Sequence, residues 1–212
     1  MSSTSDPKCK KCRRAGEKLF LKGEKCFTPK CIFEKRPTPP GKPISERKHR
    51  SNLTEYGIQL KEKQKIKNVY GVSESQFHGY VKKATSENTG SPVDHLFQNL
   101  ESRLDNVVFR LGLASSRTQA RQLVSHGHFV IGKHKITIPS YRVSKGEVVT
   151  IREGSRKSPL FTAATEKLTK HPVPAWLVTD PAKLSAEVKG VPKYDKNELG
   201  FNFQSVIEFY SR

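Results

Sequence analysis

The chain lacks the features that would mark a membrane protein or an enzyme. No stretch approaches the ~20 apolar residues of a spanning helix. The first residues, Met1 to Pro7, are polar and contain no apolar signal region. We find no glycine-rich phosphate loop, nucleophile elbow or paired-carboxylate pattern, and no internal repeat. We therefore expect a cytoplasmic protein that is not an enzyme and does not enter a membrane.

Acidic and hydrophobic residues are both scarce. Lys and Arg number 39 against 20 Asp and Glu, a net charge of +19, while hydrophobic residues make up only 34% of the chain. The charge is uneven: residues 1–70 hold 19 basic and 7 acidic residues, and residues 129–170 hold 9 and 3. Basic blocks of this kind are the electrostatic footprint of a polyanion, whereas charge for solubility predicts mixed signs and a modest net charge. Composition therefore favours a nucleic acid as the partner.

All four cysteines lie near the start of the chain: Cys9, Cys12, Cys26 and Cys31. Their spacing, Cys-x2-Cys and then Cys-x4-Cys, is typical of a structural zinc site closed by four thiolates. An iron–sulfur cluster uses the same ligands and remains an alternative, while disulfides would be unusual in a protein without a secretion signal. We expect zinc to fold residues 1–45 into a metal-binding module that is too small for a core of its own.

Beyond a proline-rich linker, two capping signals predict helices. Thr54 can cap a helix that ends at Gly71, and Ser73 with Gln76 can open the next one. These helices predict a helical domain over residues 46–98, which we expect the C-terminal segment 172–212 to complete.

The next segment carries the sharpest pattern. After the N-cap Ser91, apolar residues recur at three- and four-residue steps and predict one helix that ends at Gly112. A second amphipathic helix is predicted to begin after Ser116, with Gln119 completing a capping box, and to end at Gly127.

A small sheet is predicted to follow these helices. The runs Phe129–Ile131 and 136–138 read as strands joined by a type II′ turn at Gly132-Lys133. A third apolar run, Val148–Ile151, adds another strand. Two helices packed on a small, mostly antiparallel sheet indicate an α+β domain over residues 99–171.

Several cations of this segment are predicted to bind RNA. Arginines on the two helices fall mostly off the apolar stripes, which places them on outer faces, where they either solvate the surface or grip phosphate: Arg103, Arg110, Arg117 and Arg121. We favour phosphate because the planar guanidinium fork suits it and because the hairpin adds Lys133 and Lys135. A second group of predicted RNA-binding residues lies towards the N-terminus: Arg13, Arg14, Arg47, Lys48 and Arg50.

The order of short motifs along the whole chain resembles that of the bacterial-type small-subunit ribosomal protein four family. The matching stretches include Cys9-Lys-Lys-Cys12, Tyr70-Gly-Val-Ser-Glu74, Arg103-Leu-Asp-Asn-Val-Val108, Pro139-Ser-Tyr-Arg-Val143 and Ile207-Glu-Phe-Tyr-Ser-Arg212. The segment from Arg103 looks like the αL RNA-binding motif. The resemblance therefore implies an α+β fold with a metal-binding module, a helical domain and an αL domain.

The same resemblance implies a structural protein of the small ribosomal subunit. Such a protein binds small-subunit ribosomal RNA early in assembly, at a junction of RNA helices, by recognising shape and phosphate. It also implies contact with small-subunit ribosomal protein five. Basic residues near Arg47 to Arg50 would lie where messenger RNA enters, with a part in translational accuracy.

Two other functions compete with this interpretation. An RNA-modifying or tRNA-charging enzyme can carry an αL module, but residues 1–98 have neither the length nor the motifs of a catalytic domain. A repressor that binds its own messenger is compatible with a ribosomal role, because structured messenger can mimic ribosomal RNA.

Overall fold

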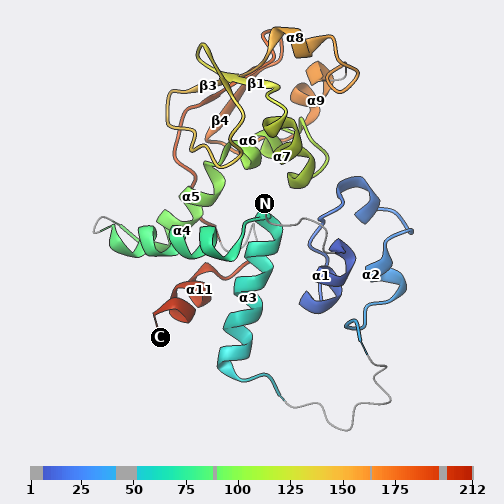
Figure 1. Cartoon of the computed structure of the whole chain (residues 1–212), viewed down its shortest axis with the longest axis vertical. Coiled ribbons are helices and arrows are strands. Elements are labelled where there is room, and N and C mark those ends of the chain that lie inside the picture. The colour runs from blue at the N-terminus through green and yellow to red at the C-terminus, as the bar shows by residue number, and fades with distance from the viewer. Residues whose placement is uncertain (1–6, 42–51, 88–89, 163, 196–199, 212) are drawn as a thin grey trace. The chain divides into compact units, whose positions relative to one another are not determined.

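The computed structural model describes residues 7–41, 52–87, 90–162, 164–195 and 200–211. They form two compact units, one from Met1–Leu96 with Asp195–Arg212 and the other from Phe97–Tyr194 (Figure 1). We call them the helical unit and the sheet unit and describe each by itself. None of the described helices is long and apolar enough to cross a membrane.

The helical unit is built from short N-terminal helices, two longer helices and the C-terminal helix: α1 (Lys8–Ala15), η1 (Gly23–Cys26), α2 (Ile32–Lys35), α3 (Glu55–Tyr70), α4 (Glu74–Ser86) and α11 (Phe203–Tyr210). The predicted caps are confirmed, since the Thr54 hydroxyl accepts from the Gly57 N–H and the Ser73 hydroxyl from the Gln76 N–H. Gly71 ends α3 at φ +65°, a left-handed conformation that glycine adopts without strain.

A charged cluster fastens the C-terminal helix to the rest of this unit. Glu74, just after the cap of α4, accepts from Lys63 at 2.6 Å, from Lys67 at 2.7 Å and from the Tyr210 hydroxyl at 2.9 Å. The Lys63 ammonium also lies 4.4 Å from the centre of the Phe209 ring. Burial raises the pKa of Glu74, but the three donors outweigh burial and lower it to about 2.

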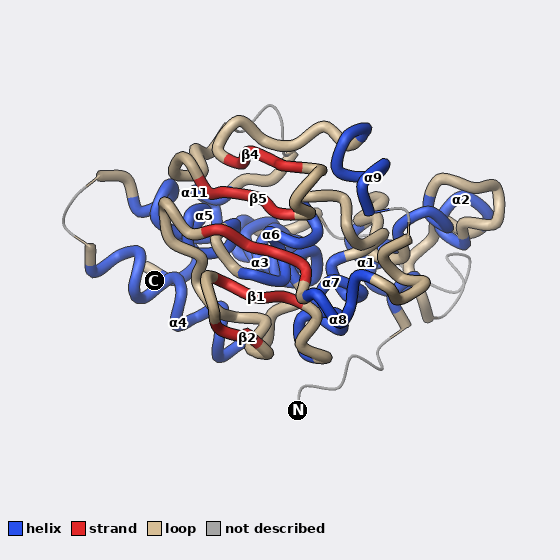
Figure 2. The backbone as a smooth tube through the Cα atoms, turned by 90° about the horizontal axis from the view of Figure 1, so that it is seen from above, coloured by secondary structure: helices blue, strands red, loops and turns tan. Residues whose placement is uncertain are grey.

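The sheet unit contains five strands: β1 (Phe129–Ile131), β2 (His134–Ile136), β3 (Val148–Ile151), β4 (Leu177–Asp180) and β5 (Ser185–Val188). Their order is β2-β1-β3-β5-β4, and every pairing is antiparallel (Figure 2). The helices of this unit are α6 (Leu104–Arg110), α7 (Arg117–Ser125), α8 (Glu153–Arg156) and α9 (Ala164–Lys170), and α5 (Pro92–Glu101) spans the boundary between the units. The predicted α+β class is confirmed.

The C-terminal segment 172–212 divides differently from the prediction. Residues 172–194 do not complete the helical unit: they supply β4 and β5, and Leu177, Ala186 and Val188 are buried in the core of the sheet unit. Only the last stretch, Asp195–Arg212, belongs with the helical unit. The physical reason is long-range strand pairing: β5 forms hydrogen bonds with the edge of β3 that would otherwise be left unpaired.

The predicted hairpin forms, with a shift of its second strand. Gly132 has φ +60° and Lys133 does not have a positive φ, as a type II′ turn requires. Because this turn has two residues, His134 must pair with Ile131, so the strand runs over His134–Ile136 and not over 136–138.

One predicted helix is in fact two. The apolar stripe suggested a single helix from Ser91 to Gly112, but α5 ends at Glu101 and α6 begins at Leu104. Between them Arg103 adopts an extended conformation, with ψ 137°, and forms an antiparallel bridge with Arg142. The break is therefore fixed by pairing with a distant segment.

Candidate RNA interface

Arg103 is a buried residue, so its predicted position on an outer face is wrong. Its side chain is 1% exposed. The Nε and Nη2 atoms donate to the two carboxylate oxygens of Asp105 at 3.0 and 2.7 Å, a bidentate pair. Arg121, from α7, lies 3.8 Å from the same carboxylate with its side chain 36% exposed. Arg103 therefore stabilises the first turn of α6 through Asp105, whereas the side chain of Arg121 extends to the surface.

Arg110 and Arg117 belong to a second polar network. Arg110 donates to both oxygens of the buried Glu101, each at 2.8 Å. Asn106 connects the two arginines, because its amide nitrogen donates to Glu101 at 3.0 Å and its oxygen accepts from Arg117 at 2.8 Å. The Arg117 guanidinium also stacks 4.4 Å from the centre of the Phe109 ring. These contacts hold both partly exposed guanidinium groups in fixed positions.

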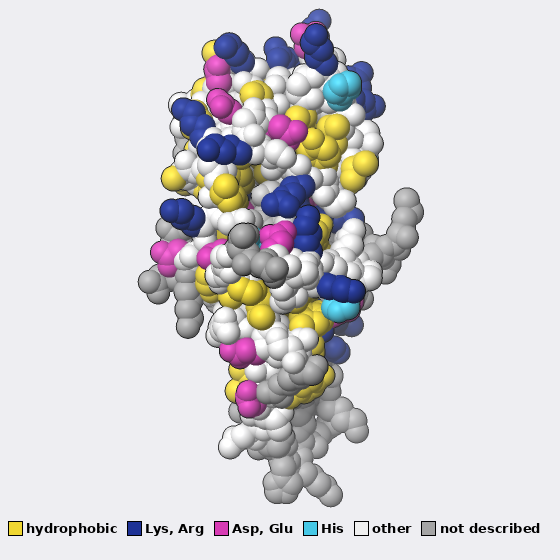
Figure 3. Space-filling model, turned by 90° about the vertical axis from the view of Figure 1, so that its left-hand side faces the viewer, with side chains coloured by type: hydrophobic (Ala, Val, Ile, Leu, Met, Phe, Trp, Pro, Cys, Tyr) yellow, Lys and Arg dark blue, Asp and Glu magenta, His cyan; other side chains and the backbone are white. Residues whose placement is uncertain are grey.

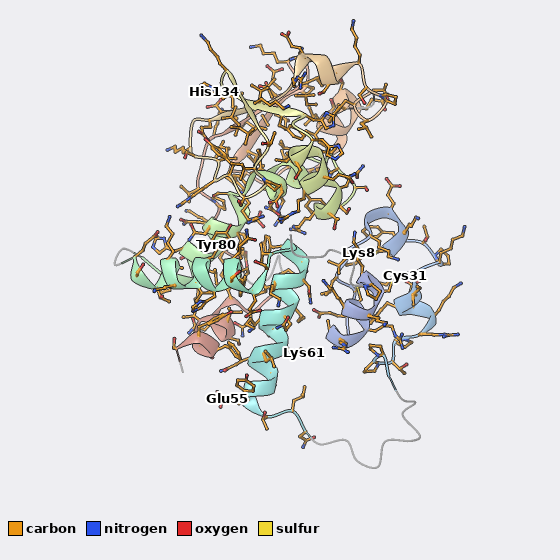
Figure 4. The ribbon with its side chains drawn as sticks, in the orientation of Figure 1. Lys8, Cys31, Glu55, Lys61, Tyr80 and His134 are labelled. Carbon is orange, nitrogen blue, oxygen red and sulfur yellow. The ribbon has the colours of Figure 1, made fainter. Side chains whose placement is uncertain are left out.

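The hairpin cations lie at the surface. Lys133 and Lys135 are exposed on either side of His134, which Figure 4 labels. A Cβ at Gly127 would overlap the Lys135 side chain, and Gly127 has φ +73°. Glycine at this position therefore lets the Lys135 stem cross the end of α7, where a cation meets the negative end of the helix dipole.

Further cations of the sheet unit were missed by the sequence analysis. Arg142, Arg152 and Arg156 are exposed. Burial lowers the pKa of His128, and the nearby His126, Arg152 and Lys135 lower it further, which shows how closely the positive groups gather. Arg152 and Arg156 follow β3 at a four-residue spacing, a signal that could have identified them.

On the face drawn in Figure 3, Lys and Arg side chains are spread over the upper part, where the sheet unit lies, with acidic and hydrophobic side chains between them. On such a surface the positively charged side chains are separated from one another. This arrangement suits phosphates of a folded RNA, which are themselves separated in space.

The N-terminal cations have different positions. Arg13 donates to the Thr38 carbonyl oxygen at 2.7 Å, and Arg14 is exposed beside a cavity. Arg47, Lys48 and Arg50 lie outside the described residues.

The cysteines gather in one small module. Cys9, Cys26 and Cys31 line a cavity of about 410 Å³, and Cys12 is buried. Burial raises the pKa of the Cys12 thiol, and proximity to the other three thiols raises it further. Cys31 and Lys8 are labelled in Figure 4. Among the described residues no three His, Cys, Asp or Glu side chains are placed together so as to hold a metal ion.

Two helices on an antiparallel sheet, with fixed arginines and an exposed basic hairpin, define an α+β protein of the RNA-binding class. Two family models match the chain: the Ribosomal protein S4/S9 N-terminal domain over residues 4–101 and the S4 domain over residues 102–149. The boundary between the two matches coincides with the break between α5 and α6.

Full-length relatives identify the family. The chain is 46% identical to small ribosomal subunit protein uS4 of Caldicellulosiruptor saccharolyticus and 45% identical to that of Syntrophomonas wolfei, in each case over all of both chains. It is 44% identical to the same protein of Desulfovibrio desulfuricans, again over both whole chains. The chain belongs to the uS4 family of small-subunit ribosomal proteins. This confirms the predicted family and the prediction that the chain is not an enzyme.

Proposed function

We propose that this chain is a structural constituent of the small ribosomal subunit and binds its ribosomal RNA. The observation that carries the proposal is the 43–46% identity of this chain to small ribosomal subunit proteins uS4, over the full length of both chains. The net charge of +19 supports it, because RNA is a polyanion. We further propose that the chain binds early and nucleates assembly of the subunit.

The proposed mechanism is recognition of RNA shape and phosphate. Arg110, Arg117 and Arg121 are held by carboxylate, amide or ring contacts, so they give up less side-chain freedom when they bind. Lys133 and Lys135 reach RNA from the exposed hairpin. Arg103 acts as a positioning residue.

Removing both hairpin lysines is expected to weaken RNA binding and reduce its dependence on salt. Each phosphate that the protein no longer neutralises should reduce the log–log salt slope by about 0.7–0.9. We therefore expect Lys133→Ala with Lys135→Ala to flatten the slope by roughly 1.5 units in binding to small-subunit ribosomal RNA. The matched control is Lys189→Ala with Lys193→Ala, which removes the same charge from exposed positions of the same unit. Equal slopes in the two variants would contradict a role of the hairpin.

We also propose contacts with small-subunit ribosomal protein five and with messenger RNA, and a part in translational accuracy. The support is the cluster Arg47, Lys48 and Arg50 together with the family resemblance. Replacing all three with alanine is expected to slow strand separation of structured messenger in reconstituted ribosomes while leaving assembly intact. An unchanged rate of strand separation would count against this role.

For the cysteines we propose a structural zinc ion. The donor set fits in number and chemistry, because four thiols lie in one module and three of them line one cavity, although the described side chains do not converge to ligand distance. Cys9, Cys12, Cys26 and Cys31 would hold the ion, which would supply a cross-link between α1 and the loop before α2. An iron–sulfur cluster is the alternative occupant.

A further inference from the structure

The helical unit contains a groove that the proposed αL contacts do not use. It has a volume of about 670 Å³ and is lined by residues of α1 and α3. Glu17, just after the end of α1, forms an ion pair with Lys65 of α3. The α3 residues that line the groove recur at three- and four-residue steps and so share one face: Gly57, Leu60, Lys61, Gln64, Lys65, Lys67 and Asn68. We call this feature the α1–α3 groove.

Three cations around the groove make no direct contact with a carboxylate in the described part of the chain. Lys61 does lie near Glu62, whose pKa is raised by burial and lowered by this lysine. Among the described residues Lys11, Arg14 and Lys61 form no side-chain hydrogen bond or ion pair, whereas Lys65 and Lys67 are each paired with a carboxylate. Unpaired cations at the edge of a groove lose little on meeting an anion, because no existing pair has to be broken.

The Lys61 ammonium lies close to the end of α1. Lys61 is labelled on α3 in Figure 4, and a Cβ added at Gly16, which ends α1, would lie 3.6 Å from its Nζ. The groove's single acidic lining residue, Glu74, is already held by Lys63, Lys67 and Tyr210. The electrostatic balance of the groove is therefore positive, and its occupant should be negative.

The groove offers more than charge. Its lining includes the exposed Leu53 and the half-buried Leu60, beside Ala15 and Val72, which are already buried within the unit. The side-chain amides of Gln64 and Asn68 add groups that can both donate and accept hydrogen bonds. An occupant that uses all three features has a flat apolar face, a polar edge and a phosphate.

We propose that the α1–α3 groove binds an unstacked nucleotide of ribosomal RNA, as a second RNA site of this chain. The base lies on the apolar residues with its edge against Gln64 and Asn68, and its phosphates meet Lys11, Arg14 and Lys61. Bases splayed out of loops and bulges are what proteins commonly read in RNA. An acidic peptide would use the cations, but its charged side chains would leave the apolar residues of the groove uncovered. The proposal deepens the proposed function and rests on it.

The test uses the full chain and a hairpin RNA with one bulged 2-aminopurine, whose fluorescence reports on that base alone. The wild-type chain is expected to protect the bulged base from quenching by acrylamide. It should also bind this hairpin at least about fivefold more tightly than the same hairpin without the bulge, the lower end for one buried base. Arg14→Ala with Lys61→Ala should remove both effects. Gln64→Ala, which keeps the charge, should reduce protection even if the first variant folds poorly.

The matched control is Lys35→Ala with Arg36→Ala, which removes one lysine and one arginine from exposed positions of the same unit outside the groove. Its protection and affinity are expected to equal those of the wild type. Protection that persists in the groove variants would place the base elsewhere and overturn the proposal. Absent protection, or competition by an acidic peptide alone, would overturn it as well.

The experiments distinguish an error in the groove proposal from an error in the proposed ribosomal function. If the wild-type chain binds small-subunit ribosomal RNA in preference to duplex but does not protect the bulged base, the groove proposal alone is wrong. If it shows no such preference, the proposed function is wrong and the groove loses its basis.

Discussion

Replacing Asp105 with alanine is expected to lower the free energy of unfolding of the sheet unit by about 3–5 kcal/mol. Asp105 is 4% exposed, and its carboxylate neutralises the buried guanidinium of Arg103. Without Asp105 the buried guanidinium loses its carboxylate partner, which costs far more than the pair itself contributes. Urea denaturation followed by the fluorescence of Trp176, which packs against the core of this unit, measures the change.

Two further variants separate the buried pair from a general charge effect. Glu153→Ala removes a carboxylate from an exposed position of the same unit and should change stability by less than about 0.5 kcal/mol. Arg103→Met combined with Asp105→Leu removes both charges and is expected to be more stable than Asp105→Ala alone. A destabilisation by Asp105→Ala no larger than that of the exposed control would contradict this account of Arg103.

Removing zinc is expected to unfold the N-terminal module while the sheet unit stays folded. Structural zinc contributes on the order of 10 kcal/mol to modules of this size, and few buried side chains would replace it: Cys12, Ala15, Leu19 and Val69 form the small cluster there. A strong chelator should release one zinc ion per chain, expose four thiols to a thiol reagent and open residues 7–41 to proteases, all without changing the fluorescence of Trp176.

The control for this experiment is the double variant Cys9→Ser with Cys31→Ser, on which the chelator should have no effect. Native mass spectrometry of protein purified without chelator gives the metal content directly. A chain that carries no metal would contradict the zinc proposal, and bound iron with sulfide would assign the thiols to a cluster.

Local signals in the sequence predicted much of this fold. Thr54, Ser73 and Ser116 cap the helices that follow them because each hydroxyl needs only a backbone N–H three residues on. The turn at Gly132 is also a local signal. A glycine with positive φ at the first central position allows a two-residue hairpin turn.

Long-range contacts explain what the sequence did not predict. The apolar stripe continues across Ser102 and Arg103, so periodicity cannot reveal a break that depends on pairing with Tyr141 and Val143. Periodicity also predicted that Arg103 lies on an outer face. A buried arginine is stable only with a carboxylate partner, and periodicity does not reveal that partner. For the same reason β4 and β5 were missed: their place in the sheet depends on β3, about thirty residues earlier in the sequence.

The most direct test of the central claim is equilibrium binding of the whole chain to bacterial small-subunit ribosomal RNA and to duplex RNA of equal length, across a salt series. If the chain recognises a defined folded RNA, tight binding to ribosomal RNA should persist at high salt while binding to duplex disappears. Equal and equally salt-sensitive binding to both RNAs would mean that the charge of +19 acts without specificity, and would contradict the claim.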